Sequence, residues 1–343
     1  MNAFVTGVSG FVGGRLAAAL ARRGDAVKGL IHARPVPPAE DVAVVRGDIN
    51  DGGLLAEAFR GVDIVFHCAA ALGASSLGEK GFRAVNAGGT KTVLAAARRS
   101  GVGRVVHFSS AGVLGRVKEG RAADEGHPLD PRDAYDRTKL EGERIALAAA
   151  GEGLDVVVVR PGWVYGPGDR RTLKLVRAVA RRRFALVGRG RTLQTPVYVD
   201  DLVEGTLLVA AEGRGGEIYN LAGSELLTVA EMAAEIAAAL GVRRPKARLP
   251  VFPARLAAWM LGGMFGFFGR EAPLNPSRLA FFLHPKPLAI DKARKELGYS
   301  PATSFREGMA KAVAWYRDAG WLVSPRVKRK TVRTGRGGRP CGP

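Results

Sequence analysis

The sequence is short of cysteine, of acidic residues and of long apolar runs. Its two cysteines, Cys68 and Cys341, cannot form a disulfide scaffold. The N-terminus has no basic region followed by an apolar stretch and a cleavage site, so no signal peptide is expected and a cytoplasmic location is predicted. The 343 residues hold 32 acids against 52 Lys and Arg, a net charge of +20. Taken alone, this excess would favour nucleic acid or an anionic membrane as a partner.

The excess positive charge is concentrated in two segments. Residues 170–191 contain nine basic residues and no acid, and residues 325–343 contain seven and no acid. The remaining 36 basic residues nearly balance the 32 acids. The first segment has apolar residues at helical spacing and is expected to fold, whereas the second has the composition of a disordered basic tail. Specific nucleic-acid binding is therefore not expected, and contact with an anionic membrane or a phosphate-bearing ligand stays open.

Short apolar runs alternate with longer helical patterns over residues 1–167. The expected strands are Asn2–Thr6, Ala26–Ile31, Val42–Arg46, Val62–Cys68, Arg104–Phe108 and Leu154–Arg160. The expected helices are Phe11–Arg23, Leu54–Phe59, Phe82–Ser100 and Ala134–Ala150. This alternation predicts an α/β fold with a doubly wound parallel sheet. Residues 168–324 predict a smaller substrate-binding lobe, with some segments returning to the sheet.

Residues 251–268 form the most apolar stretch. They fall short of the ~20 residues that cross a bilayer, and they include Arg255 and three glycines, so no transmembrane span is expected. Three interpretations stay open: a core helix of the second lobe, which is favoured, an apolar lid over a lipophilic substrate, or a surface that touches a membrane.

A glycine-rich turn follows the first expected strand and leads directly into a helix. Gly7, Gly10 and Gly13 stand at Gly-x-x-Gly-x-x-Gly spacing, with Phe11 and Val12 before the last of them. Glycines allow close approach of the backbone to a pyrophosphate, and a helix N-terminus offers free N–H groups. Because the strand and the helix that this motif requires are both present, the turn predicts a dinucleotide site.

Further cofactor contacts are expected where other strands end. Asp48 and Ile49 follow the third strand, where an acid could accept from the adenine amino group. Small residues at the end of the fourth strand leave room for the cofactor; these are Ala69, Ala70 and Ala71. His32 and Arg34 follow the second strand, where an acid would bind the ribose of NAD, so a preference for NADP is predicted.

Tyr135 and Lys139 stand four residues apart at the start of an expected helix and so share one face. The ordinary pKa of a phenol, ~10, is too high for proton transfer at neutral pH, and a neighbouring ammonium is expected to lower it. Ser109 and Ser110 end the fifth strand, whose carboxyl end faces the same crevice as the glycine turn.

No cluster of His, Cys, Asp and Glu has metal-ligand spacing, so no metal is expected. His67 and His107 fall within strand patterns. They are interpreted as core histidines with satisfied hydrogen bonds rather than as catalytic bases.

In order along the chain, these segments resemble the landmarks of the extended short-chain dehydrogenase/reductase family, also called the NAD-dependent epimerase/dehydratase family. The likeness covers about residues 2–320. Besides the glycine turn it is carried by Asn86-Ala87-Gly88-Gly89-Thr90, Phe108-Ser109-Ser110, Tyr135 with Lys139, residues 160–167 and Val197-Tyr198-Val199-Asp200-Asp201.

The resemblance implies a Rossmann domain over residues 1–167 that binds NAD or NADP. Tyr135 would be the acid/base, Lys139 would bind the nicotinamide ribose, and Ser110 would bind the reacting hydroxyl or carbonyl. Asn86 either supports the packing of the active-site helix or is a polar group inside its own helix. Further cofactor contacts are expected at Asn86, Ser109, Tyr135, Lys139, Pro161, Gly162, Trp163 and Val164.

Two departures from the family pattern narrow the reaction. Members that dehydrate nucleotide sugars carry an Asp-Glu pair just after the active-site hydroxyl residue, and Ala111 and Gly112 stand here, so a dehydratase is not expected. Many nucleotide-sugar members carry an Arg that pairs with the substrate diphosphate. The neutral Gln194 stands at that position, although Arg189 or Arg191 could substitute.

With those members set aside, the sequence resembles the branch of 3β-hydroxysteroid and sterol dehydrogenases, dihydroflavonol reductases and hopanoid-associated enzymes. The predicted function is hydride transfer between NAD(P) and a secondary alcohol or ketone on an apolar ring-bearing molecule, which is sterol-, terpenoid- or flavonoid-like. A nucleotide-sugar epimerase is the alternative enzyme, and a non-catalytic NAD(P) sensor is the alternative of another class. The resemblance also implies a homodimer formed through segments 82–100 and 134–150.

Overall fold

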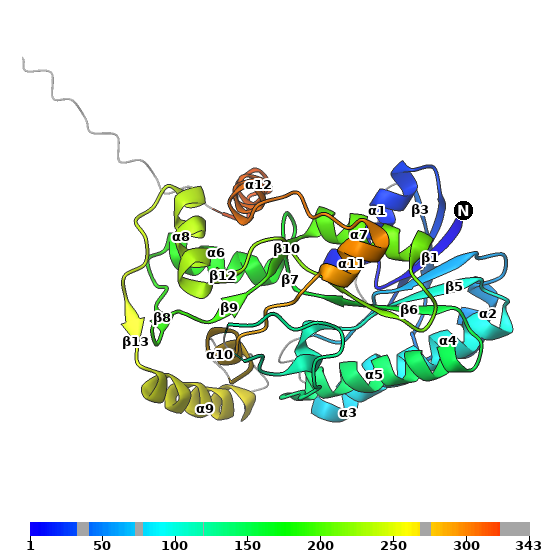
Figure 1. Ribbon diagram of the computed structural model, residues 1–343, viewed down its shortest axis with the longest axis horizontal. Helices are drawn as coiled ribbons and strands as arrows, with labels where there is room; N and C mark the ends of the chain where they lie inside the picture. Colours follow the sequence, from blue (N-terminus) through cyan, green and yellow to red (C-terminus); the bar gives the residue numbers. More distant parts are fainter. Residues whose placement is uncertain (33–40, 73–77, 119, 268–275, 323–343) are drawn as a thin grey trace, which may run out of the picture.

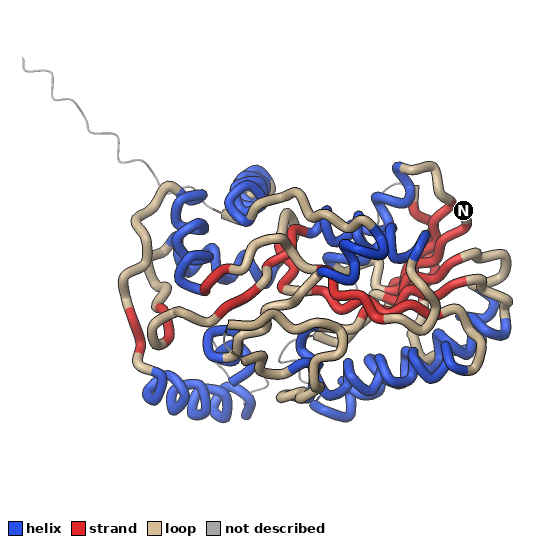
Figure 2. The backbone as a smooth tube through the Cα atoms, in the orientation of Figure 1, coloured by secondary structure: helices blue, strands red, loops and turns tan. Residues whose placement is uncertain are grey.

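The frame of the protein is a seven-stranded sheet, shown in red in Figure 2. The computed structural model describes residues 1–32, 41–72, 78–118, 120–267 and 276–322. The strand order is β11-β6-β5-β4-β1-β2-β3, and every neighbouring pair is parallel. The strands are β1 (Asn2–Thr6), β2 (Ala26–Ile31), β3 (Val42–Arg46), β4 (Ile64–His67), β5 (Arg104–Phe108), β6 (Val156–Pro161) and β11 (Ile218–Leu221). The predicted doubly wound α/β fold is thereby confirmed, with the ends of the expected strands placed to within two residues.

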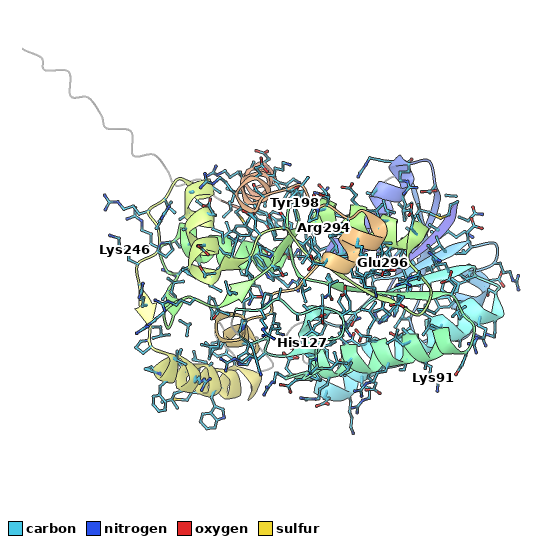
Figure 3. All side chains as sticks on the ribbon, viewed as in Figure 1. Lys91, His127, Tyr198, Lys246, Arg294 and Glu296 are labelled. Atoms are coloured by element: carbon cyan, nitrogen blue, oxygen red, sulfur yellow. The ribbon has the colours of Figure 1, made fainter. Side chains whose placement is uncertain are left out.

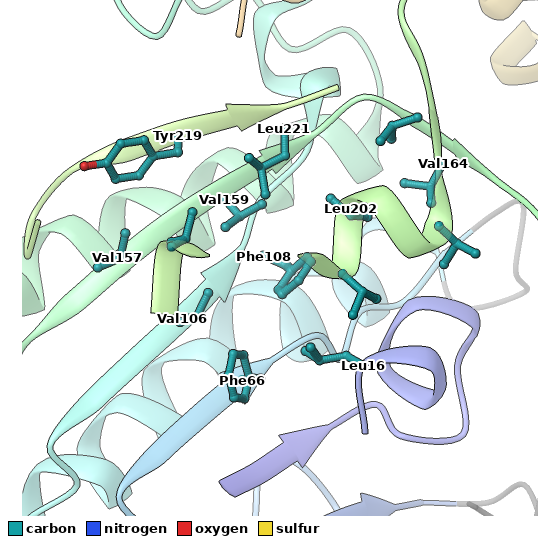
Figure 4. Close-up of a cluster of buried hydrophobic side chains, with 14 of the residues drawn as sticks. Leu16, Phe66, Val106, Phe108, Val157, Val159, Val164, Leu202, Tyr219 and Leu221 are labelled. Atoms are coloured by element: carbon teal, nitrogen blue, oxygen red, sulfur yellow. The ribbon is translucent and has the colours of Figure 1, made fainter. Parts of the chain in front are cut away.

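Helices cover both faces of this sheet because its central strands are apolar throughout, as in Val156–Val159, which is wholly buried. One face carries α1 (Phe11–Arg22), α7 (Val199–Glu212) and α11 (Asp291–Leu297). Figure 4 shows the core on this side, where Leu16 of α1 and Leu202 of α7 lie over the sheet. The other face carries α2 (Gly52–Ala58), α4 (Gly89–Arg99) and α5 (Ala134–Gly151).

Two expected helices differ in the structure. Helix α2 begins at Gly52, two residues early, because the Asp51 carboxylate caps it by accepting from the backbone N–H groups of Gly53 and Leu54. The helix expected over 82–100 is divided into α3 (Gly78–Arg83), a π-helical turn (Ala84–Gly88) and α4. Such turns occur often at functional sites, and this one contains Asn86.

The second lobe lies on the left in Figure 1, at the end of the molecule away from β1–β5. Its helices are α6 (Arg170–Ala180), α8 (Val229–Leu240), α9 (Val251–Phe267), α10 (Pro276–Leu283) and α12 (Phe305–Asp318). Short strand pairs connect them: β7 (Trp163–Tyr165) with β10 (Pro196–Tyr198), β9 (Leu193–Gln194) with β12 (Leu227–Thr228), and β8 (Leu186–Val187) with β13 (Arg248–Leu249). Helices α6, α8 and α12 enclose a core of their own.

The apolar stretch after residue 250 does not form the expected core helix. Helix α9 buries Ala254 and Ala258, whereas Phe252, Trp259 and Met260 are exposed. Its buried face is therefore narrow and made of small residues. Among the described residues, no helix combines the length and the hydropathy that crossing a bilayer requires.

A buried ion pair joins the sheet to helix α5. The Arg160 guanidinium donates to Glu143 through two nitrogens, Nε at 2.9 Å from Oε2 and Nη2 at 2.6 Å from Oε1. The two side chains are only 2% and 1% exposed. Arg160 also donates to the Glu125 carbonyl at 3.1 Å, so three segments meet at one side chain. Removing one partner of such a pair leaves a buried charge without compensation.

We expect Arg160→Leu to lower the free energy of unfolding by about 3–5 kcal/mol, because Glu143 is left buried without its cation. Arg60→Leu is the matched control, since Arg60 pairs with Glu57 where both side chains are largely exposed, and we expect it to change stability by less than about 1 kcal/mol. Urea unfolding followed by circular dichroism measures both. Equal losses in the two variants would contradict the structural role of the buried pair.

Candidate active site

The glycine turn brings β1, α1 and the end of β4 into close contact. Gly7 has φ +72°, and a Cβ there would lie 2.8 Å from the Ala69 nitrogen. A Cβ on Gly13 would lie 2.4 Å from the Gly7 carbonyl oxygen. Side chains at either position would force the segments apart. The glycines are therefore required by the turn itself and by its approach to β4.

The N-terminus of α1 is suited to a phosphate. Gly10 precedes the helix and brings no capping side chain, and the first turn consists of Phe11, Val12 and Gly13 without an acid. The backbone N–H groups of this turn are thus available to an anion, and the helix dipole favours one. These residues fit the pyrophosphate of a dinucleotide, and the cofactor contacts expected from the sequence stay a prediction.

The residues expected near the adenine form a polar cluster at the ends of β2 and β3. Asp48 accepts from the Asn50 backbone N–H at 2.8 Å and from its side-chain amide at 3.0 Å. His32 Nε2 lies 3.4 Å from Asp48 Oδ2, and both side chains are exposed. Ile49 is instead buried in the core against Gly89. Arg34 lies outside the described residues.

Tyr135 lies in the first turn of α5, which Asp133 caps by accepting from the Asp136 N–H. The Ser110 side chain lies near enough to its phenol to affect the pKa of that group. Burial raises the pKa of Tyr135 to about 12, while the Arg171 guanidinium and the Ser110 side chain act to lower it. The sequence had predicted a lowered pKa, and for the protein without cofactor that prediction is wrong because desolvation outweighs the nearby positive charge.

Lys139 is buried one turn further along α5 and is 2% exposed. Its ammonium donates to the Phe108 carbonyl at the end of β5, at 2.5 Å. Burial lowers the pKa of Lys139 to about 8, against an opposing effect of Cys68 and Glu143. The lysine therefore carries a proton that it holds only weakly, within reach of β4 and β5.

The two serines after β5 have different environments. Ser109 is buried and its hydroxyl donates to Glu143 Oε2 at 2.5 Å, which ties it to the ion pair with Arg160. Ser110 is half-buried, accepts from the Gly112 N–H at 3.0 Å and faces Tyr135. Of the two, Ser110 has the hydroxyl that can meet a ligand beside the phenol.

Asn86 connects the end of β4 with α5. Its Oδ1 accepts from the Ala71 N–H at 2.8 Å, and its Nδ2 donates to Thr138 Oγ1 at 3.0 Å. The side chain is fully buried. Of the two roles that the sequence left open, contact with the active-site helix is the one present.

The two core histidines differ from each other. His67 Nδ1 lies 2.8 Å from Thr6 Oγ1 and Nε2 lies 3.0 Å from Thr90 Oγ1. Burial lowers its pKa to about 3, so it stays neutral. His107 is equally buried, but neither of its ring nitrogens has a hydrogen-bond partner among the described residues. The prediction of satisfied hydrogen bonds is correct for His67 and wrong for His107.

The segment expected beside the nicotinamide crosses from the sheet to the second lobe. The Gly162 N–H donates to the Leu221 carbonyl at 2.9 Å, and a Cβ there would lie 2.6 Å from the Thr195 oxygen. The Trp163 ring lies 5.4 Å from that of Phe281 and 6.3 Å from that of Phe305, between centroids. Pro161 to Val164 thus begin an aromatic wall formed with the second lobe.

Sequence reasoning missed the pair formed by Asp136 and Lys286. The Lys286 ammonium donates to Asp136 Oδ2 at 3.1 Å, across 150 residues of chain. Burial raises the pKa of Asp136, and Lys286 opposes it. A Cβ on Gly112 would lie 1.7 Å from Asp136 Oδ1, so the carboxylate occupies the space of that side chain. The only local feature that could have indicated this pair is the carboxylate that directly follows Tyr135 in the sequence.

Gln194 is buried in the second lobe. Its amide Nε2 donates to the carbonyls of Phe281 at 3.2 Å and His284 at 3.3 Å. It therefore holds helix α10 and the segment after it. Arg189 and Arg191, which the sequence offered as substitutes for a diphosphate-binding Arg, are exposed.

The fold is that of a nicotinamide-dependent oxidoreductase. It combines a glycine turn suited to a dinucleotide, at the first strand of a doubly wound sheet, with a Tyr-x-x-x-Lys helix and a serine beside it. Residues 3–222 match the NAD dependent epimerase/dehydratase family, and the chain belongs to that family.

Curated relatives include ketone-reducing and steroid enzymes. A 4-hydroxy-2-methyl-3-oxo-4-farnesyl-3,4-dihydroquinoline-1-oxide ketoreductase of Stigmatella aurantiaca is 33% identical, over 90% of this chain and 95% of the relative. A 3 beta-hydroxysteroid dehydrogenase/Delta 5→4-isomerase of Mycobacterium tuberculosis is 34% identical, over 91% and 89%. Among solved structures, a dTDP-glucose 4,6-dehydratase of Streptomyces venezuelae with NAD bound is 31% identical with a TM-score of 0.75, over 94% of this chain and 98% of that one.

We expect Lys139→Met to stabilise the cofactor-free protein at pH 7, because the variant no longer buries a charge. Below about pH 8 the folded parent keeps Lys139 charged, so its stability is lowered by the full cost of burying that charge. Between there and the ordinary lysine pKa of ~10.4 the unfolded state binds more protons, so parent stability rises with pH by up to about 1.4 kcal/mol per pH unit. The advantage of the variant should therefore shrink from pH 8 to pH 10. Urea unfolding at each pH measures it, and a constant difference would contradict the depressed pKa.

Proposed function

We propose that the protein transfers a hydride between NAD(P) and a secondary alcohol or ketone on an apolar ring-bearing molecule, which is sterol-, terpenoid- or flavonoid-like. The observation that carries the substrate class is the burial of Gln194, whose amide is taken up by two backbone carbonyls. The position that supplies a cation to a substrate diphosphate in many nucleotide-sugar members is here a neutral structural residue. The ketoreductase and steroid dehydrogenase among the relatives support the same class.

In this proposal the nicotinamide gives or accepts the hydride, and the chain handles the proton. The Tyr135 phenol gives its proton to the carbonyl oxygen as the hydride arrives at the carbon, or its phenolate takes the hydroxyl proton in the reverse reaction. Ser110, whose side chain lies near the phenol, would orient the same oxygen. The Lys139 ammonium would hold the cofactor ribose, while the Arg171 guanidinium and the Ser110 side chain counter the effect of burial on the phenol.

The substrate wall is aromatic where it approaches the site. Phe281 and Trp163 contact each other, and Trp163 also stacks on Tyr165 with ring centroids 5.9 Å apart. Rings of this kind bind flat apolar ligands well, whereas a sugar diphosphate requires donors and cations. Elimination of water is also disfavoured, because the Asp136 carboxylate fills the space in which residue 112 would carry the dehydratase acid.

A nucleotide-sugar epimerase is the second candidate. It is favoured by the likeness to the Streptomyces venezuelae dehydratase and by the exposed Arg189 and Arg191 at the edge of the second lobe. Pairing of two copies through α4 and α5 stays a prediction under either function.

A screen of both substrate classes with each cofactor distinguishes the two enzymes. We expect reduced cofactor to be consumed with sterol ketones, terpenoid ketones or dihydroflavonols, and no isomer of UDP- or dTDP-sugars to form. Tyr135→Phe should lower kcat at least 100-fold, since general acid catalysis contributes ~10²–10⁴-fold, and should leave cofactor Kd within about twofold. Turnover of sugars alone would support the epimerase, and a parent without activity that still binds cofactor would support a sensor.

We further propose a preference for NADPH. The end of β2 offers the exposed His32 and no acid of its own to bind a ribose 2′-hydroxyl. The parent should therefore bind NADPH more tightly than NADH, and His32→Asp should reverse the order by favouring the hydroxyl and repelling the 2′-phosphate. Fluorescence titration gives the four dissociation constants. Tighter NADH binding by the parent would contradict the preference.

A further inference from the structure

Helix α9 presents its large apolar side chains to solvent. Phe252 is 78% exposed and Trp259 is 73% exposed, and the same face carries Met260, Leu256 and Met264 at 58%, 49% and 52%. At ~100° per residue these positions span an arc of about 140°. The opposite side contains Ala254 and Ala258, which pack against Val187 and Leu279. The helix is therefore fixed to the lobe by small residues and directs its bulky ones outward.

This arrangement is the reverse of an ordinary surface helix, which buries its large residues. Contiguous exposed apolar surfaces of this kind mark contacts with proteins or membranes. Figure 1 places α9 at the outer edge of the second lobe, with α10 between it and the rest of the molecule. Nothing in the described part of the chain covers its outer face.

The surroundings of α9 are basic. Between residues 236 and 290 the sequence has eight Lys and Arg and a single acid, Glu271. Arg255 lies beside the apolar face and is exposed, and so are Lys246 and Arg248 on the segment that leads into the helix. Figure 3 shows Lys246 projecting outward at this end of the lobe. Strand β13 pairs with β8, which adds the exposed Arg189 to the same region.

We propose that α9 lies flat in the interface of an anionic lipid bilayer. A 17-residue helix is too short to span the membrane, but it suits the interfacial position, with Phe, Trp, Leu and Met in the acyl boundary and arginines at the lipid phosphates. The alternative is that a second copy of this chain covers the apolar face of α9. That contact would bring two basic surfaces together, and their repulsion disfavours it.

Helix α9 is also close to the candidate active site. Phe282 of α10 packs with the residues under α9, and its neighbour Phe281 contacts Trp163. A single helix thus separates the membrane-facing surface from the aromatic wall. Under the proposed function, an apolar substrate dissolved in lipid would enter from this side.

The test is co-sedimentation of the full chain with vesicles, without substrate, so that its outcome is independent of the proposed activity. Vesicles of phosphatidylcholine with 30% phosphatidylglycerol are compared with phosphatidylcholine alone. We expect Phe252→Ser/Trp259→Ser to weaken binding to the anionic vesicles at least tenfold. Val44→Ser, which changes an exposed apolar residue of the edge strand β3, should alter it less than twofold. Arg248→Glu/Arg255→Glu should weaken binding to the anionic vesicles only.

A second measurement uses the unaltered chain. Brominated phosphatidylcholine in the same vesicles should quench its tryptophan fluorescence, and Trp259→Phe, which keeps the apolar face, should remove most of that quenching while binding persists. Unchanged binding of the Phe252→Ser/Trp259→Ser variant would overturn the proposal. So would a dimer without vesicles, seen by analytical ultracentrifugation, that this variant converts to monomer, because a second copy would then be the occupant.

Discussion

The bidentate ion pair between Arg160 and Glu143 is the contact on which the geometry of the site depends. It lies where β6 ends against the middle of α5, and Glu143 also holds Ser109 at the end of β5. The pair therefore fixes the rotation of α5 relative to two strands. Because Ser109 is held on the inner side, Ser110 turns towards Tyr135. Two buried charges are costly, and their cost is offset here by a full set of hydrogen bonds that gives α5 a single position.

Further constraints on the site come from the second lobe. Lys286 reaches Asp136 beside the phenol, and Gln194 holds the backbone of α10, which carries Phe281 to Trp163. The acid/base candidates thus belong to the sheet domain, while Gln194, Phe281 and Lys286 come from later segments of the chain.

Much of the frame was predictable because it rests on local patterns. Apolar runs identified all six expected strands, and Gly13 is required by a contact within its own turn, with the Gly7 carbonyl oxygen. Lys286, by contrast, meets Asp136 across 150 residues, and no local pattern signals such a meeting. The π-helical turn at Asn86 lies within one continuous helical pattern, which does not show where the hydrogen bonding changes. The apolar sequence of α9 predicted that the helix is buried. Only its small residues face the lobe, because the space beside Val187 and Leu279 is limited.

The contact between Gly112 and Asp136 sets an order in which this chain could change its chemistry. An acidic side chain at residue 112 cannot enter while the Asp136 carboxylate lies where its Cβ would be. Replacing Asp136 first would leave the Lys286 ammonium without its partner at the edge of the site. Residues 112, 136 and 286 are therefore coupled, and a change towards water elimination at residue 112 would depend on what stands at the other two positions.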